Sequence, residues 1–152
     1  MIELNISVGG VQVPGFSGDP SLLRDLEELV GCRLPLDYIE FLMCADGGCP
    51  ELNCIQVPGD DPENIFGVNS FYSLANPCVE NIQSALNSYS HLLGPHNLPI
   101  GRDGGGNQFY LMLDADPQSV WVYLLDEGGV RVKLANSFGE FVSQLHVDPD
   151  YI

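Results

Sequence analysis

Basic residues are scarce in this sequence. Its 152 residues include 5 lysines and arginines against 21 aspartates and glutamates, which gives a formal net charge of −16. Nucleic acids and anionic membranes are bound through clustered Lys and Arg, so we expect neither as a partner. An acidic surface would instead attract a basic partner and accelerate its association. The alternative explanation is that the charge serves solubility alone.

Long apolar runs and a secretory leader are also missing. The longest apolar runs have the length of a strand and fall short of the roughly 20 residues that span a bilayer. Residues 1–5 show no basic segment followed by an apolar block. The cysteines are odd in number and cannot all pair within one chain: Cys32, Cys44, Cys49, Cys54 and Cys78. These features predict a reducing, cytoplasmic location.

Patterns for catalysis and cofactor binding are equally scarce. Residues 101–107 are glycine-rich, but they lack the Gly-Lys-Ser/Thr ending of a phosphate loop, and Asp103 would repel phosphate. A turn that needs positive φ is the better explanation. Cys49 and Cys54 lack the spacing of a zinc site, and residues 114–116 lack the ligand alternation of a calcium loop. We therefore expect a non-enzymatic protein without a cofactor or metal.

The sequence does contain the pattern of a folded domain. Hydrophobic residues make up 45% of the chain, and its length suits one domain that buries about two-thirds of its unfolded surface. Residues 1–13 predict a hairpin that turns at Gly9 and Gly10. Nearly all-apolar strands are expected at 108–113 and 119–125, another at 130–134, and extended segments at 54–57 and 65–74.

Helix signals lie on both sides of these strands. Capping residues, prolines and glycines bound four apolar-periodic segments, at 20–30, 35–45, 76–93 and 137–145. Strands and helices do not alternate as they do in βαβ units. We therefore predict an α+β fold over residues 1–152, a single domain with a mixed, mostly antiparallel sheet and helices packed on one side and at its end.

Three segments, taken in order, resemble the SUKH superfamily in its Smi/Knr branch. The first is LEELVG at 26–31, continued by LPLDYIEFL at 34–42 and by Gly47-Gly48. The second is LPIG at 98–101 with DGGGN at 103–107 and Leu113-Asp114. The third is VWVY at 120–123 with LANSFGEF at 134–141. The resemblance spans about residues 19–146, leaves the N-terminal hairpin (1–14) as an extension, and is weakest at 48–77.

This resemblance implies an α+β fold without catalytic residues. Characterised bacterial members look like immunity proteins that neutralise a cognate toxin, often a nuclease, whereas eukaryotic relatives look like interaction scaffolds. We predict an immunity-type protein that occludes a basic toxin domain. The candidate partner-binding residues are acids in loops: Asp60, Asp61, Glu63, Asp103, Asp114, Asp116, Asp126 and Glu127. The alternatives are a regulatory or scaffold domain of the cell-wall-assembly regulator type and a small-molecule binder near Trp121 and Tyr123.

Overall fold

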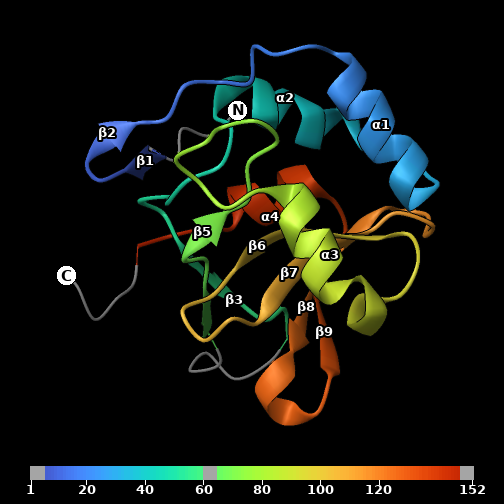
Figure 1. Ribbon diagram of the computed structural model, residues 1–152. Coiled ribbons are helices and arrows are strands. Elements are labelled where there is room, and N and C mark those ends of the chain that lie inside the picture. The colour runs from blue at the N-terminus through green and yellow to red at the C-terminus, as the bar shows by residue number, and fades with distance from the viewer. Residues whose placement is uncertain (1–5, 60–64, 148–152) are drawn as a thin grey trace.

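A five-stranded antiparallel sheet lies at the centre of the protein. The computed structural model describes residues 6–59 and 65–147 (Figure 1). The strands follow one another in the order β5-β6-β7-β8-β9, so that consecutive strands are neighbours in the sheet. They span Ser70–Phe71 (β5), Asn97–Arg102 (β6), Gln108–Met112 (β7), Ser119–Leu124 (β8) and Val130–Ala135 (β9).

Two short ribbons and a set of helices surround the sheet. The ribbons pair β1 (Ser7–Val8) with β2 (Val11–Gln12), and β3 (Cys54–Gln56) with β4 (Ile65–Gly67), both antiparallel. The helices span Ser21–Val30 (α1), Leu36–Cys44 (α2), Ile82–Leu93 (α3), Leu125–Glu127 (η1, a 3-10 turn) and Phe138–Ser143 (α4). Within the described ranges, no helix combines the length and apolar character needed to cross a bilayer.

The main core lies between one face of the sheet and helices α2 and α4. Phe109 of β7 faces Phe141 of α4, with 5.9 Å between the ring centroids. Phe138 of α4 packs edge-on against Phe41 of α2 at 4.9 Å. Successive strand residues point to opposite faces, so Phe109 and Leu111 enter this core while Tyr110 turns away from it.

Helix α3 covers the opposite face of the sheet (Figure 1). Leu93 packs there with Tyr110 and Tyr123 in a second, smaller core. Arg131 of β9 donates hydrogen bonds to the carbonyls of Leu92 (2.9 Å) and Leu93 (3.0 Å). The last carbonyls of a helix have no partner within the helix, so this guanidinium caps α3 and ties it to the sheet.

The α+β fold predicted from the sequence is confirmed, and so are several element ends. Two details were wrong: the five-stranded sheet is antiparallel throughout and not mixed, and α3 covers the face opposite α2 and α4, so the helices do not share one side. Helix α1 stops at Gly31, which has φ 74°. Helix α4 starts at Ser137, whose Oγ accepts a hydrogen bond from the Glu140 N–H (3.0 Å). The N-terminal hairpin turns at Gly9 and Gly10 as predicted, although residues 1–5 lie outside the described part of the chain.

The predicted start of α3 was wrong. The helix begins at Ile82, where Asn81 is the N-cap and accepts a hydrogen bond from the Ser84 N–H. Asn76 instead closes a local turn by accepting from the Cys78 N–H. Ser73 accounts for the difference. Its N–H donates to the Glu80 carbonyl and its carbonyl accepts from the Ile82 N–H, so the chain just before Ile82 is held extended beside Ser73.

Strand β6 was missed in the sequence because Pro99 and Gly101 resemble turn residues. Both occur in the strand, and the register with β7 shifts between them, which is where a proline is tolerated inside a sheet. Gly101 is needed because a Cβ there would lie 2.7 Å from the Ser70 carbonyl oxygen. The lack of a side chain at Gly101 therefore allows β5 to pair with β6.

Candidate functional site

The candidate acids separate into two groups because the strands alternate in direction. The β6–β7 loop and the β8–β9 turn leave one end of the sheet, and they carry Asp103, Asp126 and Glu127. The β7–β8 turn leaves the other end and carries Asp114 and Asp116. The five residues of β7 alone separate the ends by about 17 Å. These acids therefore do not form one patch.

We call the end formed by Asp103, Asp126 and Glu127 the acidic pole. Three other candidates, Asp60, Asp61 and Glu63, lie outside the described residues. They remain predictions from the sequence.

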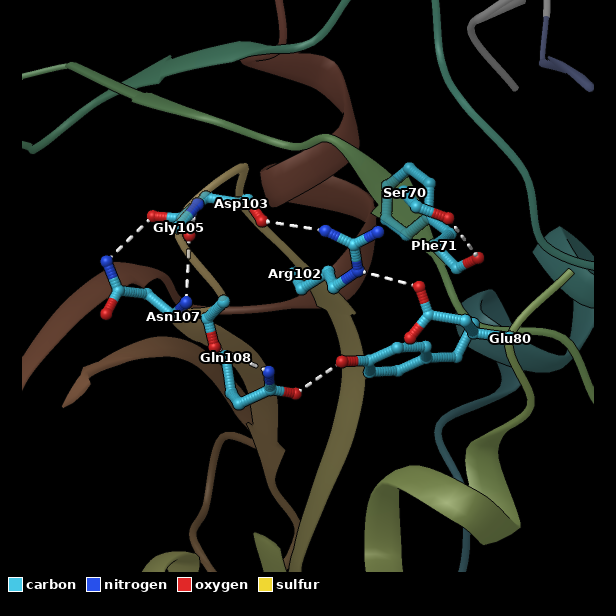
Figure 2. A network of polar contacts seen from close by, with 10 residues as sticks. Ser70, Phe71, Glu80, Arg102, Asp103, Gly105, Asn107 and Gln108 are labelled. Atoms are coloured by element: carbon cyan, nitrogen blue, oxygen red, sulfur yellow. Dashed lines mark hydrogen bonds and ion pairs between the residues drawn. The ribbon is translucent and has the colours of Figure 1, made fainter. Parts of the chain in front are cut away.

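The β6–β7 loop of the acidic pole is organised around the Asp103 carboxylate (Figure 2). Its Oδ1 accepts hydrogen bonds from the backbone N–H groups of Gly105 (3.0 Å) and Asn107 (2.8 Å). Its Oδ2 accepts from the Asn107 side-chain amide at 2.8 Å. Gly106 follows with φ 88°. The interpretation of residues 101–107 as a turn that needs positive φ is confirmed.

Asn107 connects this loop to the β8–β9 turn. The residue is buried, and its Oδ1 accepts a hydrogen bond from the Leu125 N–H at 2.8 Å. Leu125 is the first residue of η1, which continues into Asp126 and Glu127. The Asp103 carboxylate therefore positions the two following acids through Asn107. Asp126 and Glu127 are exposed, and neither has an ion-pair partner among the described residues.

A small cavity opens beside these two acids. It has a volume of about 200 Å³ and lies between β4, β8, η1 and β9. Its lining comprises four apolar side chains, one amide and two carboxylates: Phe66, Leu124, Val130, Val132, Asn107, Asp126 and Glu127. Leu124 is buried whereas Asp126 and Glu127 are exposed, so the carboxylates lie toward the solvent. We call this cavity the pole pocket.

The cation nearest along the chain to the Asp103 loop is already engaged. Arg102 forms an ion pair with Glu80 of 2.8 Å between Nε and Oε1, and its Nη1 donates to the Asp103 carbonyl at 3.2 Å (Figure 2). The hydrogen bond to Glu80 raises the pKa of Arg102. This guanidinium supports the loop backbone and does not pair with the exposed carboxylates of Asp126 and Glu127.

Hydrogen bonds of the buried Gln108 also hold the β6–β7 loop in place. Gln108 is fully buried; it accepts a hydrogen bond from the Tyr72 hydroxyl (2.6 Å) and donates one to the Gly106 carbonyl (2.8 Å). Burial raises the pKa of Tyr72. Sequence reasoning missed this pair, although a glutamine that opens an otherwise apolar strand was a signal for it.

The other acidic turn is attached to a different part of the fold. Asp114 and Asp116 are exposed there. The Gln118 side chain donates to the carbonyls of Arg33 (2.9 Å) and Leu113 (3.0 Å), and so fixes the turn to the α1–α2 connection.

The two aromatic side chains considered for small-molecule binding have structural partners. Trp121 is half-buried, and its Nε1 donates to the Ser119 hydroxyl at 2.8 Å. The Cζ atom of the Arg131 guanidinium lies over the Tyr123 ring, 5.1 Å from the ring centroid. In the part of the chain that is described, no three His, Cys, Asp or Glu residues gather where they could hold a metal ion.

Carboxylates above an apolar pocket form a surface suited to binding a cationic partner. The SMI1 / KNR4 family model (SUKH-1) matches residues 18–144, so this chain belongs to that family. A relative, the SPbeta prophage-derived uncharacterized protein YokK of Bacillus subtilis (strain 168), is 31% identical over 147 residues, covering 84% of this chain and 74% of the relative. Members of the family are generally non-catalytic immunity or regulatory proteins that act through protein–protein interaction.

Proposed function

We propose that this protein is an immunity-type protein that binds and neutralises a toxin domain with a basic surface, such as a nuclease. The observation that carries the proposal is the charge of −16 together with an acidic pole whose exposed carboxylates have no ion-pair partner among the described residues. A nuclease domain needs basic side chains to hold phosphate, and an acidic protein competes for that surface. Membership of a family that includes immunity proteins supports the same function.

Neutralisation would work by occlusion and requires no chemical step. The overall negative charge accelerates the encounter with a basic domain. The acidic pole then presents Asp126 and Glu127 on η1, whose first residue, Leu125, is held by the Asn107 side chain. A surface that is ordered before binding loses less conformational entropy when the complex forms.

The direct test is to capture the partner and measure its activity. The tagged full chain is used to isolate proteins from its source organism, and any captured toxin domain is assayed alone and with the chain added back. We expect a stable complex in which the toxin is inactive. A captured toxin that stays fully active in the complex contradicts neutralisation. Specific capture of a kinase or cell-wall enzyme instead supports the regulatory alternative.

Charge variants then test the electrostatic part. Charge reversal of the acids at 60–63 should slow association and weaken its dependence on salt. Neutralising Asp126 and Glu127 together should have a similar effect. Neutralising Asp114 and Asp116 is the matched comparison, because it makes the same change in net charge at the other end of the sheet. If none of these variants alters association, electrostatic attraction is not part of the mechanism.

A further inference from the structure

We propose that the pole pocket is an anchoring site for one arginine side chain of the partner protein. The proposal rests on the function above, in that the occupant belongs to a protein with a basic surface. It adds the place of contact and the chemistry of the residue that enters. The pocket combines an apolar interior with two carboxylates toward the solvent, and an arginine side chain has the complementary arrangement.

The walls of the pocket match the aliphatic part of an arginine. Phe66 contributes from β4, and Val130 and Val132 contribute from β9. Val130 is 49% exposed, so part of its apolar surface is open to solvent beside the pocket. Covering these side chains with three methylene groups removes apolar surface from water and so favours binding.

The carboxylates match the guanidinium. Arginine binds carboxylates through paired N–H donors in a planar fork, whereas lysine offers a compact and strongly hydrated charge. Asp126 and Glu127 are adjacent in η1 and both line the pocket. A purely apolar occupant would remove these carboxylates from water without supplying a partner, which is unfavourable. A bare divalent cation would find apolar walls where it needs several oxygen ligands.

Charge complementarity supports an occupant from outside the chain. No lysine or arginine lines the pocket. Arg102 is paired with Glu80, and Arg131 binds the carbonyls at the end of α3 on the opposite face of the sheet. These two cations are therefore committed elsewhere in the structure, and among the described residues neither Asp126 nor Glu127 has an ion-pair partner.

The pocket is also held in place before anything binds. Asn107 lines the pocket while its amide joins the Asp103 carboxylate to the Leu125 N–H. The start of η1 is thus fixed to the β6–β7 loop. Asp103 acts here as a positioning residue, because its own oxygens are occupied by loop donors.

The test uses the isolated full chain and a defined probe. N-acetyl-L-arginine amide is titrated into the isotope-labelled protein, and backbone amide shifts are followed by NMR. For a ligand of this size we expect a dissociation constant on the order of 1 mM. The shifts should concentrate at residues 124–130 and at Asn107, with no comparable change at residues 114–118. N-acetyl-L-citrulline amide, which is neutral and nearly the same shape, should bind at least about tenfold more weakly.

Matched variants separate the site from general charge. Asp126→Asn with Glu127→Gln should weaken arginine binding by about tenfold, whereas Asp114→Asn with Asp116→Asn changes the net charge equally and should leave it unaltered. All four residues are exposed, so both variants should fold. Equal binding of citrulline, equal shifts at both ends of the sheet, or equal loss in the two variants would each overturn the proposal. None of these results depends on toxin neutralisation, which is judged by the capture and activity assay.

Discussion

Asp103 and Asn107 are bound to each other twice, because the two carboxylate oxygens of Asp103 accept the backbone and side-chain N–H groups of Asn107, each at 2.8 Å. The remaining amide oxygen of Asn107 reaches Leu125 in the next loop of the same end. One acid of the pole is therefore structural, and it positions the other two. Asp103, which the sequence analysis proposes for partner binding because of its charge, holds the β6–β7 loop together through its carboxylate.

Replacing Asp103 should loosen the acidic pole. Asp103→Ala removes three hydrogen bonds to a charged acceptor, and we expect a loss of about 1–3 kcal/mol in the free energy of unfolding. Urea unfolding at pH 7 measures it. Asp114→Ala is the matched control, because that carboxylate is exposed and should change stability by no more than about 0.5 kcal/mol. Equal effects of the two substitutions would contradict the positioning role of Asp103.

Two buried tyrosines should respond oppositely to removal of their hydroxyl groups. Among the described residues, the Tyr38 hydroxyl is buried without a hydrogen-bond partner, whereas the Tyr72 hydroxyl donates to the buried Gln108. Tyr38→Phe should leave stability unchanged or raise it by up to about 1 kcal/mol, and Tyr72→Phe should cost about 1–3 kcal/mol. Thermal and urea unfolding of the two variants provide the comparison. A large loss for Tyr38→Phe would show that its hydroxyl is satisfied.

Alkaline pH should destabilise the fold through the same tyrosines. Burial raises the pKa of Tyr38, with a contribution from Asp46, and burial also raises the pKa of Tyr72. An unfolded tyrosine loses its proton near pH 10 while the folded one keeps it, so the unfolded state binds fewer protons. Below about pH 10 these tyrosines are protonated in both states, and their contribution to the free energy of unfolding is fully present. As pH rises further, the unfolded state is favoured and the free energy of unfolding falls.

Urea midpoints across this range test the expectation. The decline above about pH 10 should be shallower in Tyr38→Phe than in the natural protein, because one raised pKa is removed. If the two proteins show the same alkaline slope, Tyr38 does not contribute to the dependence.

Arg131 should matter for stability more than its exposure suggests. Arg131→Met keeps an unbranched side chain over Tyr123 and removes the donors to the Leu92 and Leu93 carbonyls and to the Tyr110 hydroxyl, so we expect a loss of about 1–2 kcal/mol. Lys133→Met makes a similar change two residues along β9 and should stay within about 0.5 kcal/mol. Denaturant unfolding gives both values. Similar losses in the two variants would show that the α3 cap contributes little.

Local chemistry made part of this fold predictable. Gly31 and Ser137 bound helices because a left-handed residue and a hydroxyl cap satisfy groups at helix ends, and both signals depend on a few neighbouring residues. The apolar runs of β7 and β8 are equally local. Strand β6 could not be identified in this way, because Pro99 and Gly101 are explained only by β5 and β7 on either side.

The candidate site was predictable in its charge and not in its shape. The acids of η1 stand out in the sequence, whereas Phe66 and Val130 are 64 residues apart and line one pocket only in the folded chain. The role of Asn107 likewise depends on Leu125, 18 residues away. Contacts across such separations follow from strand order, which hydrophobic periodicity alone does not determine.

The alternating direction of the strands has a consequence for how this family could diversify. Asn107 and Leu113 flank the two ends of β7, and the Asn107–Leu125 hydrogen bond joins two loops that lie at the same end. We therefore expect a change in length or composition at one hairpin tip to leave the structure of the other tip unaltered. We expect substitutions at one end of the sheet to alter that surface while the strands and the other end keep their structure.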